Sequence, residues 1–141
     1  MMESNLPPRV FCDTSFFYAC LDASDSNHER AGKLIERAVA SATAFYCTWD
    51  IISETVTLLR YRNSYASAMA FLKEVKPALQ ILDYGDRVRS EAEQVFELYG
   101  RDHRLSFCDA ISFVVVSTLL EHMPCLSFDR DFKELGLTVL T

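Results

Sequence analysis

The chain has 141 residues, half of them hydrophobic, with 20 acidic and 14 Lys or Arg side chains and a formal net charge of −6 at pH 7. This length fits one domain with one substantial core. The negative charge argues against a protein that binds nucleic acid through a broad basic surface, but it is compatible with acids gathered around a metal ion. The longest apolar stretch, residues 110–120, is shorter than the roughly 20 residues that a membrane-spanning helix needs.

The first eight residues are mostly polar, end in Pro7-Pro8 and lack the apolar core of a signal peptide. We therefore expect a flexible segment over residues 1–8, followed by a single domain over residues 9–141 that is soluble, cytoplasmic and not bound to a membrane. The five cysteines are odd in number and widely spaced, with no zinc-binding or redox spacing, which favours free thiols in a reducing compartment.

The first predicted strand covers residues 9–12 and ends at Asp13, which is followed by Thr14 and Ser15. A short apolar run of this kind is typical of a buried strand in a parallel sheet. Asp13 would then lie at the carboxyl end of the strand, where ligands bind in open α/β sheets. One of the two hydroxyl residues could cap the next helix and the other could orient Asp13.

A short apolar helix over residues 15–21 and a polar break lead to an amphipathic helix that begins at Asn27. A second strand follows at residues 44–48, at the distance along the chain that a right-handed βαβ unit requires. On the amphipathic helix we expect the following side chains to face inward: Ala31, Leu34, Ile35, Ala38 and Val39.

Thr48 can cap the next helix, residues 49 to about 61, and Glu54 lies within the apolar face of that helix. An ionised acid is seldom left there without a partner, because desolvation disfavours its charged form. Glu54 therefore either serves a site or lies at the edge of the face and pairs with Arg60 or Arg62. Helix geometry alone does not choose between these alternatives.

A long apolar helix over residues 107–120 is predicted to be covered on both sides, with Ser106 as a possible cap and Asp109 in its first turn. A structural role would suffice to explain this acid. Asp129 follows a strand end just as Asp13 does, so the acids can converge on one edge of a sheet. The remaining predicted elements are helices at 64–76, 86–99 and near 128–132, and strands at 78–82, 124–127 and 137–140.

Four short motifs in sequence order resemble those of the PIN-domain family and, more narrowly, of the VapC-like ribonucleases of toxin–antitoxin systems. The resemblance runs from Arg9 to the end of the chain. The motifs are Phe11-Cys12-Asp13-Thr14-Ser15, Ile52-Ser53-Glu54-Thr55-Val56, Leu105-Ser106-Phe107-Cys108-Asp109-Ala110 and Ser127-Phe128-Asp129-Arg130-Asp131-Phe132.

The resemblance implies a three-layer α/β/α fold with a parallel sheet of four to five strands. It also implies an Mg²⁺- or Mn²⁺-dependent endoribonuclease that hydrolyses RNA phosphodiester bonds through an acidic quartet. We expect Asp13 and Asp109 to be direct metal ligands, with Asp129 and Glu54 completing the site and orienting water. Three further positions match supporting residues of the family, namely Ser15, Ser127 and Asp131.

An acidic centre needs cations nearby to hold a polyanion. The candidates for phosphate contacts are Arg101, His103, Arg104 and Arg130, with Arg60 and Arg62 as more distant possibilities. The alternative, which the sequence favours for these residues, is that they are solvated surface charges. The three histidines show no metal-ligand spacing, so we expect them to be structural or exposed.

The resemblance further implies an RNA substrate, a homodimer and possibly an antitoxin partner. One alternative is a PIN-domain protein that acts in RNA processing or binds RNA or protein without cutting. Another is a phosphoaspartate receiver, but the paired acids after the first strand and the lysine after the last are missing. The haloacid-dehalogenase pattern also fails, because Ser15 stands where a second Asp is required.

Overall fold

Five short parallel strands form the centre of the protein in a computed structural model that describes residues 5–140. Their order across the sheet is β3-β2-β1-β4-β5, which confirms the predicted parallel sheet of four to five strands. The strands are β1 (Arg9–Cys12), β2 (Ala44–Thr48), β3 (Gln80–Leu82), β4 (Cys125–Leu126) and β5 (Val139–Leu140).

The central strand β1 lies between β2 and β4, and its Phe11 pairs with Tyr46 on one side and Cys125 on the other. The backbone amide of Asp13 extends this pairing by donating to the carbonyl of Leu126 over 3.1 Å. Because parallel strands end at the same edge of a sheet, the residues that follow β1 and β4 become neighbours there. This register places Asp13 beside the start of the β4–α7 connection.

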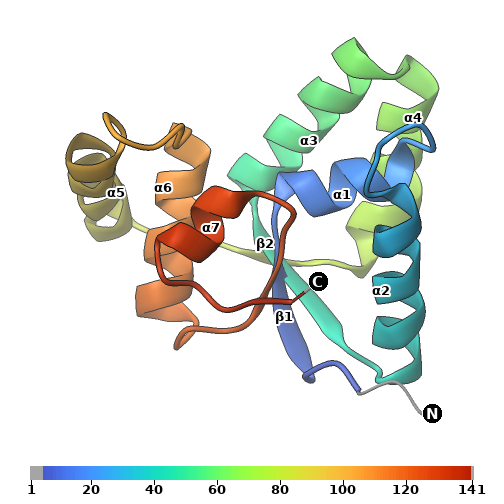
Figure 1. Ribbon diagram of the computed structural model, residues 1–141, viewed down its shortest axis with the longest axis horizontal. Coiled ribbons are helices and arrows are strands. Elements are labelled where there is room, and N and C mark those ends of the chain that lie inside the picture. Colours follow the sequence, from blue (N-terminus) through green and yellow to red (C-terminus); the bar gives the residue numbers. More distant parts are fainter. Residues whose placement is uncertain (1–4, 141) are drawn as a thin grey trace.

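Helices cover both faces of the sheet, as predicted, and Figure 1 shows α5 and α6 on one side of the strands with α1 and α2 on the other. Among the described residues, no helix is both long and apolar enough to span a membrane. The helices are α1 (Thr14–Leu21), α2 (His28–Ala40), α3 (Trp49–Arg62), α4 (Tyr65–Ala70), α5 (Asp86–Tyr99), α6 (Phe107–Val114) and α7 (Arg130–Glu134).

Two of the predicted helices change their winding before they end. The helix that begins at Tyr65 becomes a π-helical turn over Phe71–Val75 and then a 3₁₀ turn over Lys76–Ala78, and α6 continues as a π-helical turn over Val115–Leu119. In the second case the hydroxyls of Ser117 and Thr118 donate to the carbonyls of Phe113 and Val114. These hydroxyls compete with backbone amides for α-helical acceptors, which favours a wider turn.

The inward face of α2 is narrower than the sequence pattern indicates. Ala31, Leu34 and Ala38 are buried, but Val39 is 76% exposed, so its predicted inward position is wrong. Val39 lies about 100° beyond Ala38 around the helix, past the edge of the apolar stripe.

The segment before β1 packs against the domain as far as the structure describes it. Leu6 is buried, and its amide donates to the Ser41 hydroxyl over 3.0 Å. The expected flexible segment therefore does not extend over Leu6, while residues 1–4 of it lie outside the described residues. All five cysteines are free, as expected.

Phenylalanine side chains fill the core between α1 and the α4 region. Phe17 is fully buried, and its ring centroid lies 5.9 Å from that of Phe16 and 5.2 Å from that of Phe71. Phe16 also contacts Phe128, which belongs to the connection after β4. The same helix that follows Asp13 is therefore anchored by several aromatic contacts.

We expect Phe17→Ala to lower the free energy of unfolding by about 3–5 kcal/mol, because it leaves a cavity among these rings. Urea denaturation followed by circular dichroism measures this change. Leu98→Ala is the control, since Leu98 is 70% exposed and should change stability by less than about 0.5 kcal/mol. Equal effects of the two substitutions would contradict this packing.

Candidate active site

Three carboxylates from three separate elements meet at the carboxyl edge of the sheet. Asp13 follows β1, Asp109 lies in the first turn of α6, and Asp129 is the N-cap of α7. Each offers a carboxylate oxygen, and these oxygens all lie within 4.8 Å of one another. Asp13 and Asp109 are buried, with 2% and 5% exposure, while Asp129 is partly buried. The predicted convergence of these three acids is therefore present in the structure.

Helix caps position two of the acids. The amide of Asp109 donates to the hydroxyl of Ser106 over 3.0 Å, and the amide of Ser106 donates to Asp109 Oδ2 over 3.2 Å, forming a capping box. Asp129 Oδ1 accepts the amide of Asp131 over 2.9 Å at the start of α7. The structural role foreseen for Asp109 is thus real, and the same carboxylate also belongs to the acidic group.

A pair of serine hydroxyls holds Asp13. Ser15 and Ser127 both donate to its Oδ2, over 2.8 Å and 3.0 Å. Each hydroxyl in turn accepts a backbone amide: Phe128 donates to Ser15 Oγ over 2.9 Å, and Asp129 donates to Ser127 Oγ over 3.0 Å. These bonds fix the orientation of Asp13 and tie the β4–α7 connection to it.

The other oxygen of Asp13, Oδ1, is buried and has no hydrogen-bond partner among the described residues. Burial raises the pKa of Asp13 to about 6, although the hydroxyls of Ser15 and Ser127 favour the charged form. Burial, followed by the charge of Asp13, raises the pKa of Asp109 to about 7. Burial also raises the pKa of Asp129. Ionising these groups together is costly without a nearby cation.

This donor set suits a hard divalent cation. Mg²⁺ and Mn²⁺ prefer carboxylate oxygens, and a buried oxygen without a hydrogen-bond partner is available for coordination. Asp13 and Asp109 are therefore well placed as ligands, with Asp129 beside them. Chemically, such a group can hold a cation against the phosphate of a substrate.

The three acids line a cleft of about 470 Å³, and Glu54 of α3 lines the same cleft. Glu54 is partly buried but stands outside the close group of three carboxylates. Among residues 5–140, no ion pair joins it to Arg60 or Arg62, so the alternative in which Glu54 pairs with one of these arginines is not found. Glu54 thus faces the cleft without belonging to the cluster.

Of the candidate phosphate contacts, the exposed side chains of Arg62 and Arg104 line this cleft. Arg130 lines a neighbouring cleft, and Arg101 lines neither of these two in the described part of the chain. Asn27, which the sequence indicated only as a helix start, lines both clefts. Asn27 reaches these clefts only because α2 packs near the edge of the sheet, and no local sequence pattern predicts that packing.

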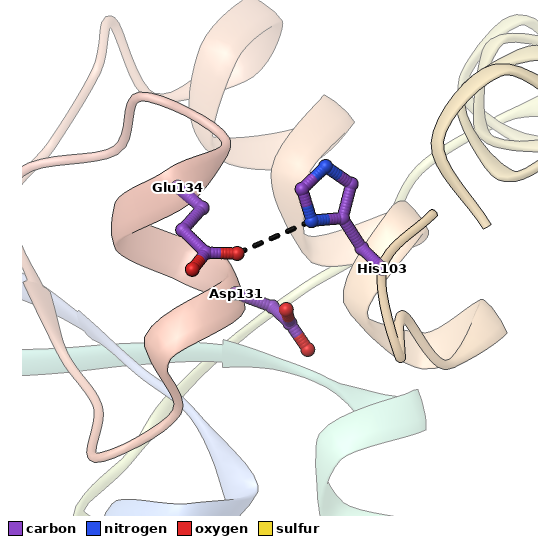
Figure 2. A group of neighbouring side chains, drawn as sticks. All are labelled: His103, Asp131 and Glu134. Atoms are coloured by element: carbon purple, nitrogen blue, oxygen red, sulfur yellow. Dashed lines mark hydrogen bonds and ion pairs between the residues drawn. The ribbon is translucent and has the colours of Figure 1, made fainter. Parts of the chain in front are cut away.

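Asp131 takes part in a different cluster. Its carboxylate lies near His103 and Glu134, with ligand atoms within 4.8 Å of one another. Figure 2 shows His103, which lies before α6, facing the two acids of α7, and His103 Nδ1 lies 3.2 Å from Glu134 Oε2. Asp131 supports Asp129 through its backbone amide, and its charge contributes to the raised pKa of Asp129, while its carboxylate also belongs to the cluster with His103. The motif spacing could not reveal this, because His103 comes from a distant segment.

A model of the PIN domain matches residues 10–137, and the chain belongs to the PIN-domain family. Among individual relatives, it is 28% identical over 122 residues to a VapC ribonuclease of Archaeoglobus fulgidus, covering 86% of this chain and 77% of the relative. It is also similar to the solved structure of VapC20 from Mycobacterium tuberculosis, described as a toxin that cleaves the sarcin–ricin loop. That match has a TM-score of 0.72 and 25% identity, covering 92% of this chain and 96% of the other.

Two more distant structures share the fold. One is VapBC2 from Rickettsia felis, solved bound to a DNA fragment from its promoter, with a TM-score of 0.64 and 11% identity over 94% of this chain and 97% of the other. The second is FitAcB from Neisseria gonorrhoeae, with a TM-score of 0.62 and 10% identity over 94% of this chain and 96% of the other. The family resemblance and the fold class inferred from the sequence are both confirmed.

The raised pKa of Asp109 has a consequence for stability in the absence of metal. From the ordinary value of 3.8 up to about 7, the folded protein holds a proton that the unfolded chain has released. The free energy of unfolding should therefore fall as the pH rises through this range, by about 4 kcal/mol. Urea denaturation in chelator, at a series of pH values, measures this slope.

Asp109→Asn is the matched variant, since it keeps an acceptor for the Ser106 amide but cannot ionise. It should be more stable than the parent protein at about pH 7.5 and should show a shallower slope. Parallel slopes for parent and variant would show that Asp109 is not the group responsible.

Proposed function

We propose that the protein is a metal-dependent endoribonuclease that hydrolyses RNA phosphodiester bonds, and that it acts as the toxin of a VapBC-type toxin–antitoxin pair. One observation carries the proposal: three acids far apart in sequence bring carboxylate oxygens within 4.8 Å of one another. The similarity to a VapC ribonuclease across most of the chain supports the choice of RNA as substrate. A scaffold that does not cut RNA would have no use for this costly arrangement of buried acids.

In this proposal Asp13 and Asp109 hold Mg²⁺ or Mn²⁺ directly, and Asp129 completes the site. When bound, the ion supplies a lowered pKa for water and a positive charge opposite the scissile phosphate. Glu54, on the α3 side of the cleft, accepts a hydrogen bond from the attacking water. These four side chains are the proposed catalytic group.

The other residues act on orientation and charge. Ser15 and Ser127 hold Oδ2 of Asp13 by hydrogen bonds, so that Oδ1 is left for coordination. Arg62 and Arg104 line the acidic cleft and offset the negative charge of the entering phosphates. Asp131 contributes the amide that fixes Asp129.

The proposal extends to partners and location. Besides its RNA substrate, the protein would act in the cytoplasm as a homodimer and be held inactive by an antitoxin. Several large apolar side chains are exposed, which is compatible with such interfaces: Val39, Trp49, Tyr61 and Tyr65.

Asp13→Asn should lower metal-dependent cleavage of a mixed RNA pool by about a thousandfold or more, because it removes a charged ligand from the ion. The assay compares purified proteins in Mg²⁺, in Mn²⁺ and in chelator, and Asp109→Asn should behave in the same way. Asp86→Asn is the control, since this exposed acid pairs with Arg89 on α5 and does not line the acidic cleft; it should retain nearly full activity. Metal-dependent cleavage by Asp13→Asn at the parental rate would refute the proposal.

The hydroxyl of Ser127 should matter for metal affinity. Ser127→Ala removes one of the two donors to Asp13 Oδ2 and should weaken Mn²⁺ binding by about tenfold. Calorimetric titration measures this without any substrate. Ser26→Ala, at an exposed position, provides the comparison and should bind Mn²⁺ like the parent protein.

A further inference from the structure

A second cleft, of about 240 Å³, adjoins the acidic one and has the opposite character. It shares Asn27, Phe128 and Asp129 with the acidic cleft, so the two lie on either side of these residues. Its charged lining consists of three exposed cations and a single acid, which is Asp129 itself. The cations are Arg30, Arg130 and Lys133. The charge therefore changes sign from one cleft to the next, although the protein as a whole is acidic.

These cations have no acidic partners within residues 5–140. The ion pairs in that part of the chain involve other residues, and none includes Arg30, Arg130 or Lys133. Arg30 and Arg130 also lie in the first turns of α2 and α7, where the helix dipole disfavours a positive charge. Their positions therefore do not stabilise the helices, and they leave positive charge available to an anion.

Arg30 is held in place by two contacts. Its guanidinium lies 5.2 Å from the ring centroid of Phe128, and its Nη1 donates to Asn27 Oδ1 over 3.2 Å. A guanidinium held against an aromatic ring loses less conformational entropy when it binds a phosphate, and its planar face can also stack on a base. Both partners of Arg30 line both clefts, so this arginine lies at the junction between them.

We propose that the second cleft binds the RNA backbone on one side of the scissile bond, with Arg30 and Lys133 contacting phosphates and Arg130 adding positive charge. This proposal rests on the proposed function and extends it to the path of the substrate. An RNA strand whose scissile phosphate lies at the three carboxylates would continue past Phe128 into this second cleft, which we call the cationic cleft. The cations there offset the repulsion that the acidic group exerts on a polyanion.

RNA binding tests this proposal directly. The experiment uses the Asp109→Asn variant, so that the RNA probe is not cleaved. The probe is a fluorescein-labelled single-stranded RNA of mixed sequence, and its binding is measured by fluorescence anisotropy at several KCl concentrations. Adding Arg30→Ala and Lys133→Ala should weaken binding by about tenfold or more. The slope of log Kd against log salt should fall by about 0.7 for each phosphate that the protein no longer neutralises.

The matched control adds Lys33→Ala and Arg87→Ala instead, which removes the same charge from exposed side chains that pair with acids on their own helices. It should bind RNA within about twofold of the Asp109→Asn protein. Equal weakening of RNA binding by the two double variants would show that the loss of net charge alone explains the effect, and it would overturn the proposal. Lys133→Glu alone should weaken binding further than Lys133→Ala, and urea denaturation of each variant checks folding.

A cleavage measurement locates the cationic cleft relative to the cut. In the protein with all its acids, Arg30→Ala/Lys133→Ala should raise KM about tenfold while kcat stays within about threefold, because the two side chains lie away from the reacting atoms. Neutral methylphosphonate linkages placed on one side of the cut should raise KM for the parent protein but not for this variant. Linkages on the other side should raise KM equally for both.

The outcomes separate this proposal from the proposed function. If the parent cuts RNA and the double variant has the parental KM and salt slope, the RNA path is wrong and the nuclease assignment stands. If the parent cuts no RNA with either metal, the nuclease assignment fails, and the anisotropy experiment still decides whether the cleft binds RNA. A poly-glutamate peptide that binds the cleft more tightly than RNA of equal charge, with binding abolished in the double variant, would assign the cleft to an acidic protein partner and overturn the proposal.

Discussion

The two hydrogen bonds that the hydroxyls of Ser15 and Ser127 donate to Asp13 Oδ2 are the constraint on which the site depends. Ser15 comes from the helix after β1 and Ser127 from the end of β4, so one carboxylate oxygen joins the two strands at the sheet edge. The same hydroxyls accept hydrogen bonds from the backbone amides of Phe128 and Asp129, and these bonds fix the start of α7. Pairing of β1 with β4 therefore brings Asp13 and Asp129 together, and the cap at Ser106 adds Asp109 from α6.

The acidic group is stable only in a particular electrostatic setting. Hydrogen bonds from Ser15, Ser106 and Ser127 favour the ionised carboxylates, whereas burial and mutual repulsion disfavour them and raise the pKa values of Asp13 and Asp109. A bound cation would resolve this conflict by replacing repulsion with coordination. The arginines that line the two clefts extend positive charge outward from the same point. An acidic protein thus presents a local surface suited to a polyanion.

Much of this arrangement follows from local sequence. A strand ending in Asp13, a helix capped by Thr48 and the Ser106–Asp109 cap all have patterns of a few residues, and each is present. Features that depend on distant packing could not be foreseen. The sequence pattern predicted continuous α-helices where π-helical turns are found. Asp131 lies near a histidine from another segment, and Arg30 reaches the second cleft only because α2 packs beside the sheet edge.

The sheet order also has a consequence for how the protein is made. β1 is synthesised early but lies in the middle of the sheet. Its neighbour Asp13 is separated by 114 residues in sequence from Ser127, whose hydroxyl donates a hydrogen bond to it. A ribosome-bound chain that stops before β4 therefore exposes one side of its central strand and lacks Asp129 as well. Chains released before Asp129 is synthesised lack one of the three clustered acids, so they cannot form the complete acidic group.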